Sequence, residues 1–343
     1  MTKETVCVLG GGSFGTALAN IMANNGHLVS QWMRNEEQVE EINLTGFNSR
    51  YLPKAQLSEE LVATTDLEAA IAESDAIFVS IPSKSFEQVV ERITPLLTPD
   101  KMLISTTKGF NPNRFELMSD ILFRQNVSDQ IGVLSGPNLA KEIAAGQLTG
   151  SVIASPNDSV RSHVVELLKS PTFRVYENAD IKGVELAGAL KNIYAIVCGL
   201  AKALNVGENT MAMIMTRSLA EMSRFAVHFG ANPMTFLGLA GVGDLIATCS
   251  SPLSRNYQVG FALGSGKTLE QAVEQLGQVA EGVNTLRMVI REAEKNDLYM
   301  PLALGLSKLV FDGYKLETLV QTMMTGELRW DVEFATYEEN KNG

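Results

Sequence analysis

The segment VCVLGGGSFGTALA, residues 6–19, is the strongest constraint on the fold. It places Gly10, Gly12 and Gly15 in a G-x-G-x-x-G pattern between an apolar run and an amphipathic helical pattern. In this context Gly10 permits a tight turn, Gly12 lets a pyrophosphate approach the backbone, and Gly15 lets the helix pack closely on the strand. Free N–H groups at the start of the helix can hold the phosphates. The segment predicts a dinucleotide-binding site, with an ordinary glycine-rich turn as the alternative.

The first half of the chain alternates short apolar runs with helical patterns, which predicts a parallel sheet covered on both faces. After about residue 180 the candidate strands disappear. The predicted fold is therefore α/β: an N-terminal Rossmann-type doubly wound, mostly parallel sheet followed by an all-helical C-terminal domain. The expected domains are an NAD(P)-binding domain at 1–180, a helical substrate domain at 181–335 and a polar tail at 336–343. The candidate strands are 6–10, 27–33, 76–81, 102–107, 131–136, 151–155 and 173–178, and the main helical runs are 181–204, 210–229, 267–276, 281–296 and 302–310.

Composition argues against several classes of protein. The formal net charge of −11 disfavours non-specific nucleic-acid binding, which needs a dense basic surface. Cys7, Cys198 and Cys249 lie in apolar contexts and predict small buried side chains, and the three histidines lack metal-ligand spacing, so no metal is expected. Neither a signal peptide nor an apolar run of the ~20 residues that cross a bilayer is apparent. We expect a cytoplasmic protein without membrane insertion.

The second candidate strand bears on cofactor choice. An NAD-selective site would place Asp or Glu at its end, against the ribose 2′-hydroxyl. The sequence HLVSQWMRN offers Arg34 instead, a cation suited to a 2′-phosphate. This favours NADP(H), with NAD(H) as a second cofactor, unless Arg34 is an ordinary solvated side chain. Tyr51, in NSRYLP, either packs near the adenine or is an ordinary loop aromatic.

Three further stretches combine cations, glycines and hydrogen-bonding side chains in expected loops. STTKGF (105–110) and SGPNLAKE (135–142) follow candidate strands, at the edge where doubly wound sheets bind ligands. GLAGVGDLIATCSSPLSRNYQVG (238–260) joins a glycine-rich turn to an arginine, whose planar guanidinium can bind a phosphate through two hydrogen bonds. Each alone is more typical of an exposed charged loop, but together with the glycine pattern they favour a site. The candidates are Lys108, Gly136, Asn138, Ala140, Asp244, Ser254, Arg255 and Asn256.

Lys191 interrupts GVELAGALKNIYAIVCGLAK, residues 183–202, a small and apolar helical pattern. Burying a lysine is costly unless something compensates for the charge. In a closed cleft Asp244 could neutralise it, whereas burial and Lys108 would lower its pKa toward the range where a lysine exchanges a proton near neutral pH. The alternative is a lysine that snorkels from the end of a helix. The sequence therefore favours Lys191 as a proton donor that lies beside a nicotinamide and serves carbonyl reduction.

With these segments assembled, the chain resembles bacterial NAD(P)-dependent glycerol-3-phosphate dehydrogenases over nearly its whole length. GALKNIYAIVCG resembles the family's helix around its catalytic lysine, and residues 238–260 resemble its substrate loop; STTKG, SGPNLAKE and VAEGVNT are similar to its other cleft segments. The resemblance implies reversible hydride transfer from NAD(P)H to C2 of dihydroxyacetone phosphate. The product would be sn-glycerol 3-phosphate for glycerophospholipid biosynthesis. A homodimer is a further expectation.

The resemblance also implies residue roles. Lys191 would exchange the proton at the C2 oxygen. The substrate contacts would be Lys108, Gly136, Asn138, Lys191, Asp244, Ser254, Arg255 and Asn256. The dinucleotide contacts would be Gly10, Gly12, Ser13, Phe14, Gly15, Arg34, Tyr51, Lys108, Ala140, Arg255, Val279 and Glu281. Two positions depart from the common family pattern: Phe14 stands where Trp or Tyr is frequent, and Asn138 where Ser or Thr is frequent.

Two other functions fit parts of the pattern. A β-hydroxyacid or 6-phosphogluconate dehydrogenase would share the two domains and a helix lysine, but its pattern separates the lysine and the asparagine, which are adjacent here as Lys191 and Asn192. A dinucleotide-sensing regulator would bind the cofactor without turnover. The candidate acid–base lysine and the second phosphate site argue against such a regulator.

Overall fold

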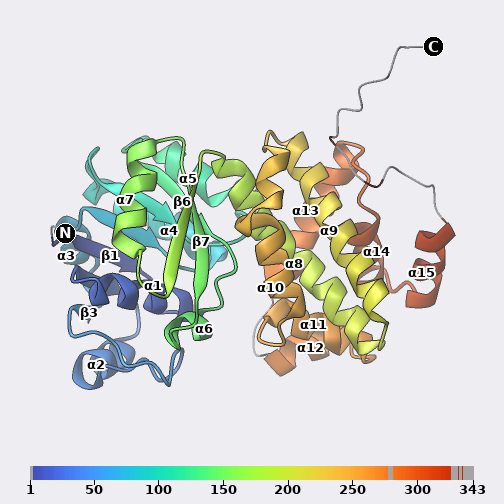
Figure 1. Ribbon diagram of the computed structural model, residues 1–343, viewed down its shortest axis with the longest axis horizontal. Helices are drawn as coiled ribbons and strands as arrows, with labels where there is room; N and C mark the ends of the chain where they lie inside the picture. The colour runs from blue at the N-terminus through green and yellow to red at the C-terminus, as the bar shows by residue number, and fades with distance from the viewer. Residues whose placement is uncertain (1–2, 277–280, 326–330, 332–333, 335–343) are drawn as a thin grey trace, which may run out of the picture.

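The computed structural model describes residues 3–276, 281–325, 331 and 334. Figure 1 shows two lobes side by side, one a sheet with helices on both faces and the other a group of packed helices. The change between them falls after the last strand, which ends at Asn178, and before the helix that begins at Ile181. The expected fold class, a doubly wound, mostly parallel sheet followed by a helical domain, is confirmed.

The sheet has eight strands in the order β3-β2-β1-β4-β5-β6-β7-β8. Neighbouring strands are parallel except β6 and β7, which pair antiparallel. The chain order reverses between β1 and β4, and doubly wound sheets bind ligands in the crevice outside such a point. The strands are β1 (Thr5–Leu9), β2 (Leu28–Trp32), β3 (Leu61–Thr64), β4 (Ala76–Val79), β5 (Met102–Ser105), β6 (Ile131–Ser135), β7 (Thr149–Ala154) and β8 (Phe173–Asn178).

Helices cover both faces of this sheet because most of its strands are apolar on both sides. One face packs against α1 (Ser13–Asn24), α2 (Glu36–Thr45), α6 (Ala140–Ala144) and α7 (Asp158–Leu168). The other packs against α3 (Leu67–Ala72), α4 (Ser83–Ile93) and α5 (Met118–Gln125). The two apolar layers hold the carboxyl edge of the sheet rigid, and the candidate ligand-binding turns lie at that edge.

Two sequence expectations need correction. Strand β3 is absent from the candidate strands because its four residues are only half buried and follow a Glu-Glu pair that is typical of a helix. The segment 238–260, expected as a loop, is largely helical. Its glycines allow tight backbone packing, since a Cβ at Gly241 would lie 2.3 Å from the Phe236 carbonyl oxygen. Such short helices depend on tertiary contacts rather than on local propensity.

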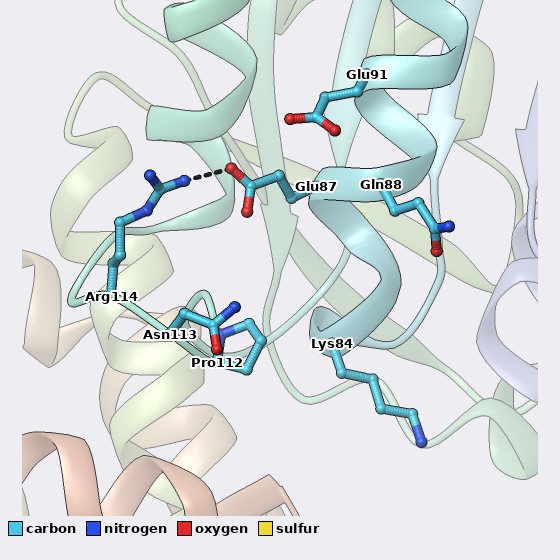
Figure 2. Close-up of a pocket in the computed structure, with 7 residues that line it drawn as sticks. All are labelled: Lys84, Glu87, Gln88, Glu91, Pro112, Asn113 and Arg114. Atoms are coloured by element: carbon cyan, nitrogen blue, oxygen red, sulfur yellow. Dashed lines mark hydrogen bonds and ion pairs between the residues drawn. The ribbon is translucent and has the colours of Figure 1, made fainter.

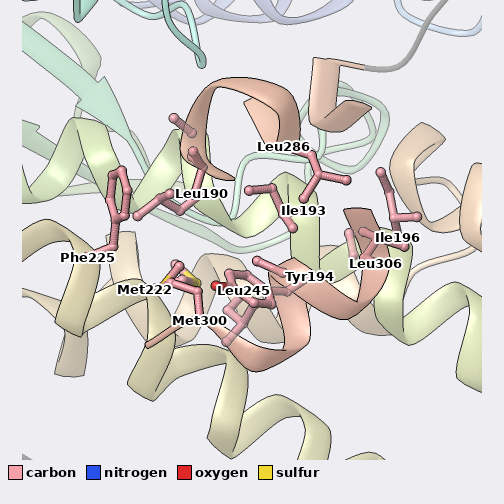
Figure 3. Close-up of a cluster of buried hydrophobic side chains, with 14 of the residues drawn as sticks. Leu190, Ile193, Tyr194, Ile196, Met222, Phe225, Leu245, Leu286, Met300 and Leu306 are labelled. Carbon is pink, nitrogen blue, oxygen red and sulfur yellow. The ribbon is translucent and has the colours of Figure 1, made fainter. Parts of the chain in front are cut away.

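The helical domain surrounds α8 (Ile181–Ala203), which is buried on almost every side. Figure 3 shows Leu190, Ile193 and Tyr194 of this helix within the apolar core. The length and composition of α8 would suit a membrane span, but 94% of its apolar window is buried inside the fold. The other helices are α9 (Glu208–His228), η2 (Pro233–Leu237), η3 (Leu239–Gly243), α10 (Asp244–Ser250), α11 (Arg255–Gly264), α12 (Leu269–Leu276), α13 (Glu281–Lys295), α14 (Pro301–Phe311) and α15 (Leu316–Thr325).

Glu185, a buried carboxylate on α8, joins the two lobes. It accepts hydrogen bonds from the backbone N–H and the hydroxyl of Ser119, in the first turn of α5. Burial raises its pKa to about 8, against the effect of those two donors. The interaction anchors the first half of α8 to the sheet domain.

Helices α8 and α11 approach closely because small residues face each other. A Cβ at Gly260 would lie 1.8 Å from the Ile196 carbonyl oxygen, and one at Gly199 would lie 2.0 Å from the Tyr257 carbonyl oxygen. This contact places the first turn of α11 relative to the middle of α8. Backbone packing therefore fixes the position of α11 relative to the middle of α8.

We expect Gly260→Ala to lower the free energy of unfolding by about 1–3 kcal/mol, because the added methyl overpacks the α8–α11 contact. The matched control is Gly207→Ala, at the start of α9, where a Cβ meets nothing within 4 Å. Urea unfolding followed by circular dichroism measures both. Equal stabilities for the two variants would contradict the packing argument.

Candidate active site

The glycine turn between β1 and α1 has the geometry expected from its sequence. Gly10 has φ +127°, and a Cβ there would lie 2.2 Å from the Ser80 carbonyl oxygen. A Cβ at Gly15 would lie 2.6 Å from the Gly10 carbonyl oxygen, so only glycine permits this approach of helix to strand. Gly12 precedes α1 with open space around it and no side-chain cap on the helix. The first N–H groups of α1 are therefore available to an anion.

Three amide side chains that the sequence reasoning missed hold this turn in place. Gln31 donates to the Gly10 carbonyl oxygen at 2.8 Å, and Gln38 donates to the Gly11 carbonyl oxygen at 2.7 Å. Asn48 donates to the same Gly11 oxygen at 3.1 Å. These three residues lie 21 to 37 positions after the glycines that they contact, so no local sequence pattern reveals the contacts. The fold brings them next to the turn.

The remaining dinucleotide candidates lie at the same edge of the sheet. Ser13 and Phe14 open α1, and the Ser13 hydroxyl donates to the Tyr51 carbonyl oxygen at 3.2 Å. Arg34 follows β2 as an exposed side chain and makes no ion pair with any described residue. Ala140 is the first residue of α6. Val279 lies outside the described residues.

At the other end of the crevice, two lysines share one buried carboxylate. The Lys191 ammonium donates to one oxygen of Asp244 and, at 2.7 Å, to the Thr248 hydroxyl. The Lys108 ammonium donates to the other oxygen of Asp244 at 2.6 Å and to the Gly136 carbonyl oxygen at 3.0 Å. Asp244 has a side-chain exposure of only 1%. The expected pairing of Lys191 with Asp244 is confirmed.

The electrostatics follow from this sharing. Burial lowers the pKa of Lys191 to about 7; the charge of Asp244 opposes the decrease, and the charge of Lys108 adds to it. With both lysines charged, the cluster carries two positive charges against one negative charge. The excess positive charge favours an anionic ligand in a chain whose overall charge is strongly negative.

Asn256 joins three elements beside this cluster. Its amide nitrogen donates to the Asn192 side-chain oxygen at 2.9 Å, and its amide oxygen accepts from the Gly282 N–H at 3.0 Å. One amide hydrogen of Asn256 remains for a ligand. Ser254 caps α11 by accepting the Tyr257 N–H, which accounts for its burial without a ligand.

Arg255 and Glu281 lie near the two lysines and belong to two different helices, α11 and α13. Arg255 begins α11 and is exposed, while Glu281 begins α13. Burial raises the pKa of Glu281, and the nearby charges of Arg255, Lys108 and Lys191 oppose the rise. The two candidate residues therefore flank the same cationic cluster.

The segment after β6 presents unpaired polar atoms to this region. Gly136 has φ +131°, and the carbonyl that it presents to Lys108 depends on this conformation. Asn138 donates to the Ser151 hydroxyl at 3.1 Å, but its buried oxygen has no partner among the described residues. The Ser135 hydroxyl, at the end of β6, is also buried and has no partner in the described part of the chain. Unpaired buried acceptors are costly, so the oxygen of Asn138 fits a role in accepting a ligand hydroxyl.

The structure thus brings Lys108, Lys191 and Asp244 into direct contact, with the Gly136 carbonyl bound to Lys108, and leaves Arg34 as an exposed side chain after β2. Sequence reasoning missed Thr248 and gave Asn192 no role in the site. Thr248 lies four residues after Asp244, a spacing that places both on one face of a helix. That spacing was unusable because the segment was expected to be a loop. Among the described residues no group of histidine, cysteine or carboxylate side chains could hold a metal ion.

Two family models cover most of the chain. Residues 5–161 match the model described as NAD-dependent glycerol-3-phosphate dehydrogenase N-terminus, and residues 180–321 match the corresponding C-terminus model. The chain is 55% identical to a glycerol-3-phosphate dehydrogenase (NAD(P)+) of Alcanivorax borkumensis over 332 residues, which are 97% of each protein. A protein of the same name from Acinetobacter baylyi is also 55% identical, over 97% of this chain and 93% of that protein.

Solved structures agree with this similarity. A crystal structure of glycerol-3-phosphate dehydrogenase from Coxiella burnetii has a TM-score of 0.87 at 35% identity, covering 94% of this chain and 99% of that one. A ketopantoate reductase from Ralstonia eutropha is more distant, with a TM-score of 0.57 at 15% identity over 93% of this chain and 99% of that one. The second likeness extends to the fold alone.

We expect Thr248→Val to lower the pKa of Lys191 by about one pH unit, because the charged ammonium loses a hydrogen-bond acceptor while the side-chain shape is kept. A carbon-13 NMR titration of the Lys191 ε-carbon measures this pKa. Thr216→Val, on the exposed side of α9, is the control and should leave the titration unchanged. An unaltered Lys191 titration in Thr248→Val would show that the hydroxyl does not stabilise the ammonium.

Proposed function

This chain belongs to the NAD-dependent glycerol-3-phosphate dehydrogenase family, and on that premise we propose that it reversibly reduces dihydroxyacetone phosphate to sn-glycerol 3-phosphate, with Lys191 as the acid–base group. The observation that carries the proposal is the buried cluster of Lys191, Asp244 and Lys108 at the carboxyl edge of a dinucleotide-binding sheet. Carbonyl reduction needs a proton donor at the oxygen that becomes an alkoxide. The cluster supplies that donor in a site where water is largely excluded.

The chemistry can be divided among the residues. The bound dinucleotide supplies the hydride. Lys191 donates the proton to the C2 oxygen during reduction and accepts it during oxidation; a pKa near 7 suits both directions. One oxygen of Asp244 accepts a hydrogen bond from the Lys191 ammonium and holds it in place. The other oxygen of Asp244 binds Lys108. Lys191 is thereby kept in one orientation in both directions.

Substrate binding uses the charge and hydrogen-bonding groups around that cluster. We assign the phosphate to Arg255 and the first turn of α11, where Ser254 and Asn256 lie, because a guanidinium at a helix start suits a phosphate dianion. Lys108 and Gly136 contact the substrate from the sheet side. Asn138 accepts a substrate hydroxyl through its unpaired oxygen. The proposed substrate therefore lies between the two domains, 1–180 and 181–335.

On the cofactor side, Gly10, Gly12 and Gly15 cradle the pyrophosphate at α1, and Ser13, Phe14, Tyr51 and Ala140 line the approach. Arg34 stands at the end of β2, where the ribose 2′ position lies in this fold. We propose NADP(H) as the preferred cofactor, with NAD(H) also used. Glu281 contacts the dinucleotide from α13; Val279, proposed for the same role, and the tail at 336–343 lie outside the described residues.

The wider setting of the reaction is also proposed. The product supplies the backbone of glycerophospholipids, and the enzyme acts in the cytoplasm. Three buried free thiols suit a reducing compartment, and α8 is buried in the fold rather than available to a bilayer. The homodimer and the exclusion of nucleic-acid and membrane partners stay predictions.

The direct test is NADPH oxidation by the purified chain on addition of dihydroxyacetone phosphate, followed by absorbance and repeated with NADH. Turnover with this substrate supports the proposal. Turnover with a β-hydroxyacid in its place, or tight NADPH binding without any turnover, would reject it.

We expect Lys191→Met to lower kcat by roughly 10²–10⁴-fold, the range for loss of a general acid, while NADPH affinity stays within about twofold. Methionine keeps an unbranched side chain in the buried site. Lys202→Met, at the exposed end of the same helix, is the matched control. Near-normal kcat in Lys191→Met would remove this residue from the proton transfer.

We expect Arg34→Ala to raise the Kd of NADPH by roughly tenfold or more and to leave NADH within about twofold, because only NADPH loses a charge-assisted hydrogen bond. Fluorescence titration of each cofactor measures both constants. Arg174→Ala, an exposed arginine on β8 at the far edge of the sheet, serves as the control. Equal losses for the two cofactors would reject the 2′-phosphate contact.

A further inference from the structure

A pocket of about 260 Å³ lies on the seam between the two domains and meets the proposed dinucleotide site at Glu281. From the sheet domain it is lined by the first turn of α4 and by Phe110, Pro112 and Asn113. From the helical domain it is lined by one side of α13, from Glu281 to Arg291. We refer to it as the α4–α13 pocket. Its volume is slightly below the usual range of about 300–1,000 Å³ for small-molecule sites, which restricts it to a small ligand.

Cations from both domains line this pocket. Lys84 comes from α4, and Arg287 and Arg291 come from α13, four residues apart and therefore on one face of the helix. Figure 2 shows the adjoining hollow, where Lys84 extends away from Glu87 and Arg114. Glu87 pairs with arginines, and Lys84 makes no ion pair with any described residue.

The two arginines are also available to a ligand. The Arg287 guanidinium lies 4.2 Å from the centre of the Phe311 ring and makes no hydrogen bond or ion pair with any described residue. The Arg291 Nε lies 3.6 Å from the Glu292 carboxylate, beyond hydrogen-bond length. Stacked or weakly paired guanidiniums suit bidentate recognition of a phosphate.

The lining of the pocket thus holds three positive side chains and one carboxylate, Glu281, while Glu292, outside the lining, pairs weakly with Arg291. The Glu281 carboxylate faces the Ser83 N–H and the cations of the reacting centre. Phe110 and Met288 provide apolar surface, and Asn113 and Asn284 provide neutral hydrogen-bonding groups. Positive charge on both walls with an apolar floor matches a phosphate group carried on a short carbon chain.

We propose that the α4–α13 pocket binds a small phosphate-bearing metabolite at a site separate from the reacting centre. The ligand would join Lys84 of the sheet domain to Arg287 and Arg291 of the helical domain. It would therefore stabilise one relative position of the domains. Glu281 lines this pocket and also neighbours Arg255 and Lys108. A ligand bound in the pocket would therefore change the electrostatic environment of the substrate site.

The test uses inorganic phosphate as the probe and the full chain with Arg255→Ala, which weakens phosphate binding at the proposed substrate site. Phosphate should raise the melting temperature saturably, beyond sodium chloride at equal ionic strength. Adding Lys84→Ala and Arg291→Ala should weaken the apparent phosphate affinity at least tenfold. Adding Lys202→Ala, an exposed lysine on α8, should leave it unchanged.

Three outcomes would overturn the proposal: no phosphate effect beyond that of the salt, equal affinity in all variants, or complete displacement of phosphate by NADPH. The last would make the pocket part of the dinucleotide site. The melting temperatures and phosphate affinities are measured without turnover of dihydroxyacetone phosphate. The failure of one proposal therefore leaves the other standing.

Discussion

The sharing of the Asp244 carboxylate by Lys191 and Lys108 is the interaction on which the site depends. A buried lysine without a partner is costly, and a buried carboxylate between two lysines is satisfied on both oxygens. The arrangement leaves the cluster with excess positive charge, and burial lowers the pKa of Lys191 to about 7, a decrease that Asp244 opposes and Lys108 increases. The same contacts therefore compensate for burial and tune the group that exchanges the proton.

That interaction exists only because three elements meet. Lys191 comes from the middle of α8, Asp244 from the first residue of α10, and Lys108 from the segment after β5. Helix α8 contacts both lobes: Glu185 anchors one end to α5, and Gly199 allows α11 to approach the other. Backbone contact between small residues sets the helix spacing, which is less adjustable than contact between long side chains. The rigidity of the site thus follows from packing that lies outside it.

The sequence was sufficient for the parts of the fold that repeat locally. Alternating apolar and helical runs predicted the doubly wound sheet, and the Gly10, Gly12 and Gly15 spacing predicted the turn at its first strand. It was insufficient for β3, whose four half-buried residues resemble a helix start, and for residues 238–260, whose glycines suggested a loop. Thr248 was missed for the same reason, since its alignment with Asp244 appears only once that segment is helical. The pairing of Lys191 with Asp244 was predictable because a buried charge needs an opposite one nearby.

By itself, the sequence determined the fold class, the dinucleotide turn and the identity of the buried lysine, because glycine spacing and hydrophobic periodicity act over a few residues. Only the tertiary structure decided that Lys108 shares the carboxylate of Asp244 with that lysine, which hydroxyl supports it, and that Lys84 of one domain lines a pocket with Arg287 and Arg291 of the other. These groups are separated by many residues along the chain, and only the packing of α4, α8, α10 and α13 brings them together. Electrostatic effects depend on distance and burial, so they become definite once that packing is known.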